Sequence, residues 1–317
     1  MRTLNPVALI TVFLLIAPLQ SAETTQPAEE QDELTEVIVQ APEPRYVAPT
    51  NRDRIGRVWV PVMINDKGPF RLVLDSGATH SAVIPSVASA LQIPLNRSPP
   101  VKLLGVTGTA VVPSIRVDSL SVGDLLVAPS TLPVVNDVFG GAEGLLGMDG
   151  MADKRIYIDF RNDFINVSYS RNRRAAVGFD TIPFLKTDLQ LLMVNTRIGN
   201  LNVRAIIDTG AQASVGNEAL RQALASRFVR KHDSIDEITG ATGETQSGKA
   251  ANISMISIGD LTMRGVRVTF GDMSIFEHWN LHDEPILLIG MDVIGLMDTL
   301  VIDYRRRELH IRARISS

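Results

Sequence analysis

Two short segments of the sequence carry an aspartate directly after aliphatic residues and directly before a hydroxyl residue and a glycine. The first is LDSGA, residues 74–78, and the second is IDTGA, residues 207–211. The glycine lets the chain turn sharply, so each aspartate can be presented from a strand end while backbone N–H groups approach it. If the two carboxyl groups meet, they cannot both ionise at low cost and share one proton. One then serves as base and the other as acid, which suits activation of a water for attack on an amide carbonyl.

We therefore predict that Asp75 and Asp208 form a catalytic pair. Ser76 and Thr209 each supply a hydroxyl that can tie one turn to the opposite copy. A single Asp-Ser-Gly or Asp-Thr-Gly is more often an ordinary β-turn. Two such turns at equivalent places in a repeat, each after an aliphatic strand, have no common structural need for an acidic residue, so their repetition favours the catalytic interpretation.

The sequence after the first 50 residues is an internal duplication, because four signals recur in the same order. In the first copy they are RLVLDSGATHSAVI (71–84), LLGVTGTAVV (103–112), SVGDLLV (121–127) and GLLGMDGMADKRIYIDF (144–160). In the second they are RAIIDTGAQASVG (204–216), DEITGATGETQSG (236–248), SIGDLTM (257–263) and LLIGMDVIGLMDTLVIDY (287–304). We expect an N-terminal lobe over residues 51–170, a linker over 171–180 and a C-terminal lobe over 181–317.

The apolar pattern within each copy predicts a mainly β fold. Apolar residues alternate or form short β-branched runs, and Gly, Asp and Asn turns separate these runs. Helical spacing is brief and follows each aspartate motif, at residues 85–92 and 217–228, with Asn217 placed to cap the second helix. We expect two β lobes, each with a short helix, related by a pseudo-two-fold axis.

The segments DSGATHS and DTGAQAS, each followed at a distance by an aliphatic-aliphatic-Gly motif, resemble the retropepsin-type aspartic proteases. The first copy, LDSGATHSAVI, is especially similar to proteases of long-terminal-repeat retrotransposons, and bacterial aspartyl-protease-like proteins are similar over roughly residues 57–312. The resemblance implies retropepsin-like lobes and catalytic roles for Asp75 and Asp208. It also implies positioning roles for the two active-site turns, which contain Ser76, Gly77, Ala78, Thr209, Gly210 and Ala211.

In that family a glycine-bearing hairpin, the flap, closes over the substrate. The matching segments here are Val106, Thr107 and Gly108 in the first copy, and Ile238, Thr239 and Gly240 in the second. Backbone N–H groups of a flap can bind an extended peptide, so the resemblance implies that substrate is held as an added strand. An ordinary hairpin loop is the alternative interpretation of each segment.

The sequence departs from the family pattern in two respects. Most free retropepsins are half this length and dimerise, whereas the two halves are fused here, so we expect a monomer. Ala78 and Ala211 stand where pepsin-like enzymes carry a hydroxyl that can bind the carboxylate. Losing that bond removes a stabiliser of the charged form, which predicts a working pH from mildly acidic to neutral. Asp149 and Asp292 are expected to cap the helical turns that follow them.

The N-terminal segment predicts export. Arg2 precedes the apolar stretch from Val7 to Leu19 and the small pair Ser21-Ala22, which is typical of a signal peptide over residues 1–22. The stretch is short for a membrane span, so we expect cleavage near Ala22, a periplasmic location and no membrane span thereafter. Residues 23–50 are rich in Glu, Gln, Thr and Pro and predict a flexible leader, which is either a tether or a pro-segment.

The composition and charge of the chain exclude several kinds of site and partner. The absence of cysteine excludes disulfides and thiolate sites, and the formal net charge of −4 with scattered charges gives no sustained basic face for nucleic acid. His278 and His282 stand four residues apart but are expected to lie in a polar loop, so we expect no metal and no cofactor. The leading hypothesis is an aspartic endopeptidase acting on exported polypeptides. Its alternatives are a catalytically silent peptide-binding module and a hydrolase of a non-protein amide, such as a peptidoglycan cross-link.

Overall fold

The computed structural model describes residues 7–8, 15–18, 48–49, 56–187, 189–224 and 229–313. Most of the expected signal peptide and leader therefore lies outside the described residues. The described parts of that region are three short strands, β1 (Val7–Ala8), β2 (Leu15–Pro18) and β3 (Ala48–Pro49). Among the described residues, no helix is long and apolar enough to cross a bilayer.

The first copy forms an N-terminal lobe built around a six-stranded sheet. Its strands, in spatial order, are β11 (Leu125–Val127), β10 (Leu120–Val122), β4 (Trp59–Ile64), β5 (Lys67–Leu74), β13 (Gly144–Leu146) and β6 (Ala82–Val83). Two further antiparallel pairs are β7 (Val101–Gly105) with β8 (Gly108–Val112), and β9 (Ser114–Val117) with β12 (Ser130–Pro133). Helix α1 (Pro85–Leu91) follows the first aspartate turn.

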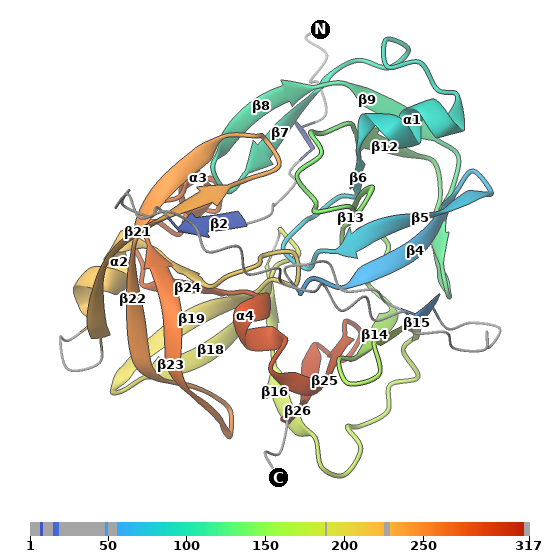
Figure 1. Cartoon of the computed structure of the whole chain (residues 1–317). Coiled ribbons are helices and arrows are strands. Elements are labelled where there is room, and N and C mark those ends of the chain that lie inside the picture. Colours follow the sequence, from blue (N-terminus) through green and yellow to red (C-terminus); the bar gives the residue numbers. More distant parts are fainter. Residues whose placement is uncertain are drawn as a thin grey trace, which may run out of the picture.

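The second copy forms a C-terminal lobe around a nine-stranded sheet that β2 completes at one edge. Its own strands, in spatial order, are β17 (Leu185–Lys186), β18 (Leu192–Ile198), β19 (Leu201–Ile207), β24 (Ile286–Ile289), β20 (Val215–Gly216), β23 (Leu261–Phe270), β22 (Thr245–Ile258) and β21 (Val229–Thr239). Its helices are α2 (Glu218–Ala223), α3 (Ser274–His278) and α4 (Met291–Ile294). Figure 1 shows the two lobes side by side, each with one strand hairpin reaching toward the other lobe.

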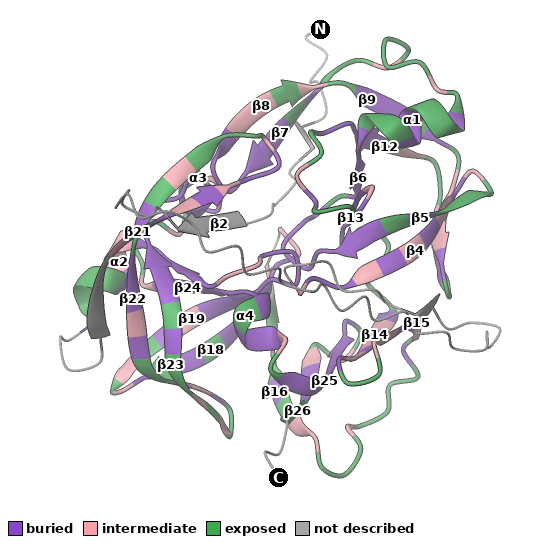
Figure 2. Cartoon of the chain, in the orientation of Figure 1, coloured by how far each residue is buried: buried purple, intermediate pink, exposed green. Residues whose placement is uncertain are grey.

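A third sheet joins the lobes. Its strands, in spatial order, are β16 (Asp180–Pro183), β26 (Glu308–Ala313), β25 (Met297–Asp303), β14 (Lys154–Asp159), β15 (Phe164–Tyr169) and β3. At its centre β14 of the first copy pairs antiparallel with β25 of the second, from Arg155 opposite Asp303 to Asp159 opposite Thr299. This interlobe sheet lies below both lobes in the view of Figure 1. Every residue of β13, β24 and β25 is buried, so the core runs through all three sheets (Figure 2).

The mainly β, two-lobed fold predicted from the sequence is confirmed. A helix follows each aspartate motif as predicted, but α2 is shorter than expected and ends at Ala223. Asn217 caps α2, because its side-chain oxygen accepts the N–H of Leu220 at 2.9 Å. Helix α3 is a correction, since the sequence around His278 predicts a polar loop and α3 ends at that residue. Ile275 and Phe276 of α3 are buried, and these apolar contacts stabilise a helix too short to show a periodic pattern.

Candidate active site

The two acidic turns begin at equivalent strand ends in the two lobes. Strand β5 ends at Leu74 and β19 at Ile207, and each strand has a parallel neighbour, β13 or β24. The N–H of Asp75 donates to the carbonyl of Leu146 in β13, and the N–H of Asp208 donates to the carbonyl of Ile289 in β24, both at 3.0 Å. The same backbone arrangement therefore places one aspartate in each lobe.

The turns of the two lobes approach so closely that a side chain larger than that of glycine would not fit. A Cβ atom added to Gly77 would lie 2.5 Å from Oδ2 of Asp208. One added to Gly210 would lie 2.5 Å from Oδ1 of Asp75. These glycines are needed for the close approach of each turn to the opposite carboxyl group.

Asp75 and Asp208 are both completely buried, and each carboxyl group lies against the glycine of the opposite turn. The N–H of Gly77 donates to Oδ1 of Asp75 at 2.9 Å. Oδ1 of Asp208 accepts two N–H groups, from Gly210 at 2.9 Å and Ala211 at 3.0 Å. Neither Oδ2 atom has a hydrogen-bond partner among the described residues. Two buried carboxyl groups that act on each other cannot both ionise at low cost, so they share one proton.

The surroundings separate the proton affinities of the two groups. Burial, and next the charge of Asp208, hold the pKa of Asp75 well above its usual value, although Gly77 and the buried guanidinium of Arg57 act in the opposite sense. Burial also raises the pKa of Asp208, but the N–H groups of Gly210 and Ala211 limit the rise to about 6. The additional N–H donor favours the carboxylate form of Asp208, so the shared proton belongs to Asp75.

Two hydroxyl groups tie each turn to the opposite lobe, as the sequence predicts. The hydroxyl of Ser76 donates to the carbonyl of Ile207 at 2.8 Å and accepts the N–H of Thr209 at 3.0 Å. The hydroxyl of Thr209 donates to the carbonyl of Leu74 at 2.8 Å and accepts the N–H of Ser76 at 3.0 Å. All four bonds are buried, so they fix the position of one turn relative to the other.

A serine and a further aspartate support each turn from behind. Ser214 donates to Asp292 at 2.8 Å and accepts the N–H of Gly290 at 3.2 Å. Ser81 makes the equivalent bonds to Asp149 at 3.3 Å and to the N–H of Gly147 at 3.1 Å. The expectation that Asp149 and Asp292 cap helices is wrong. Gly290 is the N-cap of α4 and has no side-chain cap, while both carboxylates face the serine that follows their own aspartate motif.

The predicted flaps are hairpins in both lobes, and their tips meet. Thr107 occupies the two-residue turn between β7 and β8, and its hydroxyl accepts the N–H of Gly240 at 3.1 Å. Ile238 and Thr239 still belong to β21, so the second tip comprises residues 240–244. A Cβ added to Gly240 would lie 2.5 Å from the Thr107 hydroxyl, which explains the glycine at this position.

Helix α3 of the C-terminal lobe holds the flap of the N-terminal lobe. The N–H of Ile275 donates to the carbonyl of Val106 at 3.2 Å, and the ring of His278 lies within hydrogen-bond distance of Thr109, at 3.2 Å. His282 lies 3.0 Å from Asp283, so the two histidines have different partners. In the part of the chain that the structure describes, no three His, Asp or Glu side chains are grouped to hold a metal ion.

Comparison with known families agrees with this geometry. A family model described as aspartyl protease matches residues 60–149 and 194–293. The chain belongs to the retropepsin-like aspartyl protease family. The two matches, one in each copy, carry the two aspartate turns, the two flaps and the two supporting aspartates. A search of curated proteins found no match.

The sequence did not reveal every residue near the aspartate pair of this aspartyl protease. Arg57 is completely buried just before β4, and its charge acts on Asp75. Tyr304 is also buried, its hydroxyl lies 2.5 Å from the sulfur of Met148, and burial together with the charge of Asp75 raises its pKa. An arginine at the start of a strand and a tyrosine at the end of one are typical of exposed positions, so only the packing of the lobes reveals them.

Proposed function

We propose that the protein is an aspartic endopeptidase that cleaves peptide bonds with a water activated between Asp75 and Asp208. The observation that carries this proposal is the placement of two buried carboxyl groups, one from each lobe, each against the glycine of the opposite turn. Such a pair holds one proton, so a single site contains both a base and an acid. Membership of the aspartyl protease family supports peptide hydrolysis as the reaction.

The unequal surroundings of the pair assign the two roles. Asp208 has two N–H donors and the lower pKa, so it takes the proton from the attacking water. Asp75 keeps the shared proton and donates a hydrogen bond to the carbonyl oxygen of the scissile peptide. As the tetrahedral intermediate collapses, the proton that Asp208 received passes to the leaving amine. The hydroxyls of Ser76 and Thr209 are positioning groups, because they contact only the turns and each other.

An extended polypeptide is the substrate that the flaps favour. Strand β2 of this chain pairs antiparallel with β21, with Leu15 opposite Thr239 and Pro18 opposite Asp236 (Figure 1). The outer edge of the second flap therefore accepts an added strand, and removal of the signal peptide, which contains β2, leaves this edge open to substrate. A substrate held in this way is recognised mainly through its backbone, which suits unfolded segments of many sequences.

The test is cleavage of an unfolded protein by the whole chain and by its Asp75→Asn and Asp208→Asn variants. We expect both substitutions to reduce kcat by at least a thousandfold, because neither variant can supply both proton-transfer roles. Asp260→Asn, which changes an exposed aspartate, is the matched control and should retain activity. Cleavage that survives both active-site substitutions would contradict the mechanism, and peptide binding without cleavage by the unsubstituted chain would favour the silent binding module.

We also propose that the protein is exported to the periplasm and acts there as a monomer on exported polypeptides. The apolar stretch from Val7 to Leu19 after Arg2 supports export, and the presence of both aspartate turns in one chain supports a monomer. Cell fractionation together with sedimentation of the purified protein tests both points. Recovery in the cytoplasm, or an active dimer that loses activity on dilution, would contradict them.

A further inference from the structure

Two arginine runs that are far apart in the sequence meet at one end of the interlobe sheet. Arg171, Arg173 and Arg174 lie in the segment between β15 and β16, and Arg305–Arg307 form the turn between β25 and β26. The two segments are joined directly. The guanidinium of Arg306 donates to the backbone carbonyl of Asn172 at 3.3 Å and to its side-chain oxygen at 3.1 Å. The fold thus builds a basic surface that the scattered charges of the sequence do not reveal.

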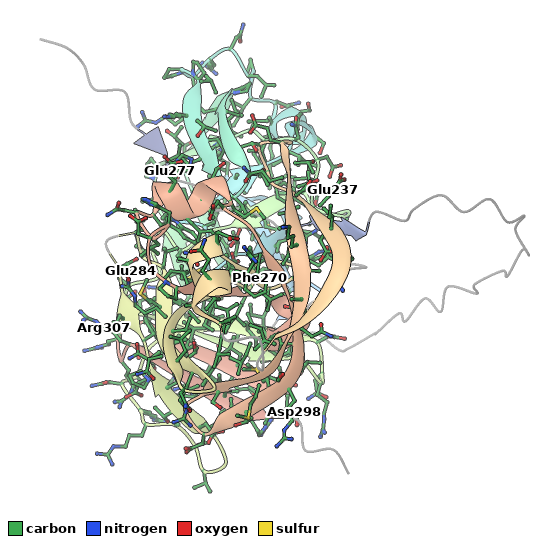
Figure 3. The ribbon with its side chains drawn as sticks, turned by 90° about the vertical axis from the view of Figure 1, so that its left-hand side faces the viewer. Glu237, Phe270, Glu277, Glu284, Asp298 and Arg307 are labelled. Carbon is green, nitrogen blue, oxygen red and sulfur yellow. The ribbon has the colours of Figure 1, made fainter. Side chains whose placement is uncertain are left out.

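We call this surface the arginine surface. Its members share a place at the same end of the interlobe sheet, and they are Arg155, Arg171, Arg173, Arg174, Arg305, Arg306 and Arg307. Figure 3 shows Arg307 lower in the view than Glu237 of β21 and Glu277 of α3. In Figure 1 the interlobe sheet lies at the bottom and the hairpin of β7 and β8 at the top, so the arginine surface and the first flap lie at opposite ends of the molecule.

The neighbouring acidic groups neutralise only part of this charge. Asp303 is buried and lies 3.7 Å from Arg155, and Glu308 lies 2.6 Å from Arg306. Asp153 lies 2.5 Å from Lys154, and Asp124 accepts the N–H of Tyr169. Arg171, Arg173, Arg174 and Arg307 are exposed, and no carboxylate of the described residues lies within salt-bridge distance of them. Positive charge thus remains uncompensated on a chain whose formal net charge is −4.

The arginine surface also carries a groove and exposed apolar groups. A groove of about 730 Å³ is lined by Arg155, Arg171, Arg173 and Arg174, by one carboxylate, that of Asp124, and by polar side chains, among them those of Asn166, Ser168 and Tyr169. Next to it, Val177 is fully exposed, at 104% of its reference area, and Tyr169 is 57% exposed. These two apolar side chains lie on the same surface as the arginines, so a partner that carries both anionic and apolar groups can contact both.

From these features we propose that the arginine surface binds an anionic phospholipid bilayer. The planar guanidinium group matches the geometry of a phosphate, and the groove provides three such groups without a carboxylate partner among the described residues, those of Arg171, Arg173 and Arg174. Val177 would enter the boundary between headgroups and acyl chains, while Tyr169 suits the polar interface. A purely polar polyanion has no use for the exposed valine, so the combination favours a lipid surface. Docked in this way, the flaps face away from the bilayer and stay accessible to polypeptides near its surface.

The test is co-sedimentation of the whole chain with vesicles of phosphatidylglycerol and phosphatidylcholine. Binding to vesicles of pure phosphatidylcholine measures the contribution of the apolar N-terminal stretch. The excess is the ratio of the affinity for mixed vesicles to the affinity for pure phosphatidylcholine vesicles, and it measures the contribution of the arginine surface. Each arginine near an anionic bilayer strengthens binding about fivefold, so Arg171→Gln with Arg173→Gln and Arg174→Gln should lower the excess about a hundredfold. Raising the salt from about 0.1 M to about 1 M, which shortens the Debye length from about 10 Å to about 3 Å, should also abolish it.

Two further variants make the test specific. Arg97→Gln with Arg116→Gln and Arg264→Gln makes the same change in net charge at exposed positions outside the arginine surface, and it should leave the excess unchanged. Val177→Ser should lower the excess about fourfold or more, because it removes buried aliphatic groups from the bilayer. Equal binding by the two triple variants would overturn the proposal. The proposal would also be overturned if the triple variant of Arg171, Arg173 and Arg174 bound vesicles as the unsubstituted chain does but no longer bound a poly-glutamate peptide. That result would make this surface a site for acidic polypeptides.

Discussion

The hydroxyl of Thr107 accepts the N–H of Gly240 at 3.1 Å, and this bond joins the tips of two flaps that belong to different copies of the repeat. Thr242 adds a hydroxyl 3.4 Å from that of Thr107. The first flap is also held by α3 through Ile275, whereas the second forms the long hairpin of β21 and β22. We infer that the second flap moves more when a substrate enters, and that the Thr107 bond closes it again.

The flap contact leads to the first prediction. Thr107→Val keeps the shape of the side chain and removes the acceptor for Gly240, so the closed state loses one buried hydrogen bond worth about 1 kcal/mol. We expect kcat/KM for a peptide substrate to fall about fivefold, with the melting temperature little changed. Thr107→Ser keeps the hydroxyl and should stay within about twofold of the unsubstituted enzyme. Equal losses in both variants would show that the hydroxyl plays no part.

The pH dependence of activity follows from the unequal aspartates. Asp208 must be ionised to act as base, and its pKa is raised to about 6 by burial. We therefore expect kcat/KM to rise with pH up to about 6 and to fall at higher pH, where Asp75 loses the shared proton. Initial rates of peptide cleavage between about pH 3 and pH 9 measure both limbs. An optimum near pH 2, typical of gastric enzymes, would contradict the assignment of Asp208 as the base.

The same pKa shifts predict how folding stability depends on pH. Burial raises the pKa of both aspartates, so the native state binds protons that the unfolded chain has already released. The contribution of Asp208 is therefore complete below its unfolded pKa of about 4 and is lost as the pH rises toward 6. Asp208→Asn removes this ionisation and should stabilise the fold at pH 7 by up to about 3 kcal/mol, with the gain shrinking toward pH 4.

Urea denaturation at pH 4 and pH 7 measures this effect. Asp260→Asn is the control, because Asp260 is exposed and its substitution removes no buried carboxylate. The two variants should therefore differ at pH 7 and converge at low pH. Destabilisation by Asp208→Asn at neutral pH would mean that the carboxylate stabilises the fold, against the raised pKa.

Much of the aspartate pair could be predicted because its signals are local and occur twice. The aliphatic run before Asp75 and before Asp208 forms β5 and β19, and the glycine after each aspartate permits the turn. The hydroxyls of Ser76 and Thr209 were assigned correctly for the same reason. Repetition supplied what a single motif lacks, since one Asp-Thr-Gly segment is usually only a turn.

The remaining features depend on contacts between distant segments, which periodicity does not encode. The interlobe sheet requires β14 of one copy to pair with β25 of the other, and each strand alone has only an ordinary alternating pattern. The role of Asp292 could not be predicted from its neighbours in the sequence, because its hydrogen-bond partner Ser214 lies 78 residues away. Helix α3 has five residues, too few for a hydrophobic period to appear.

The last prediction concerns the hydroxyls that join the two turns. Thr209→Val removes both the donor to Leu74 and the acceptor for Ser76, leaving two buried backbone groups unpaired at a cost of about 1–3 kcal/mol each. We expect a loss of about 2–5 kcal/mol in the free energy of unfolding. We also expect kcat of the folded variant to fall, because the carboxyl groups of Asp75 and Asp208 no longer align. Denaturant unfolding and peptide cleavage measure the two effects.

Two controls separate this role from general packing. Thr209→Ser retains the hydroxyl, so it should keep most of the activity and lose only about 1 kcal/mol for the missing methyl group. Thr196 is buried and its hydroxyl donates to the carbonyl of Val203 at 2.8 Å, within one lobe. Thr196→Val should therefore destabilise the fold by about 1–3 kcal/mol without lowering kcat. If Thr196→Val and Thr209→Val reduced kcat equally, the bonds between the turns would have no special part in aligning Asp75 with Asp208.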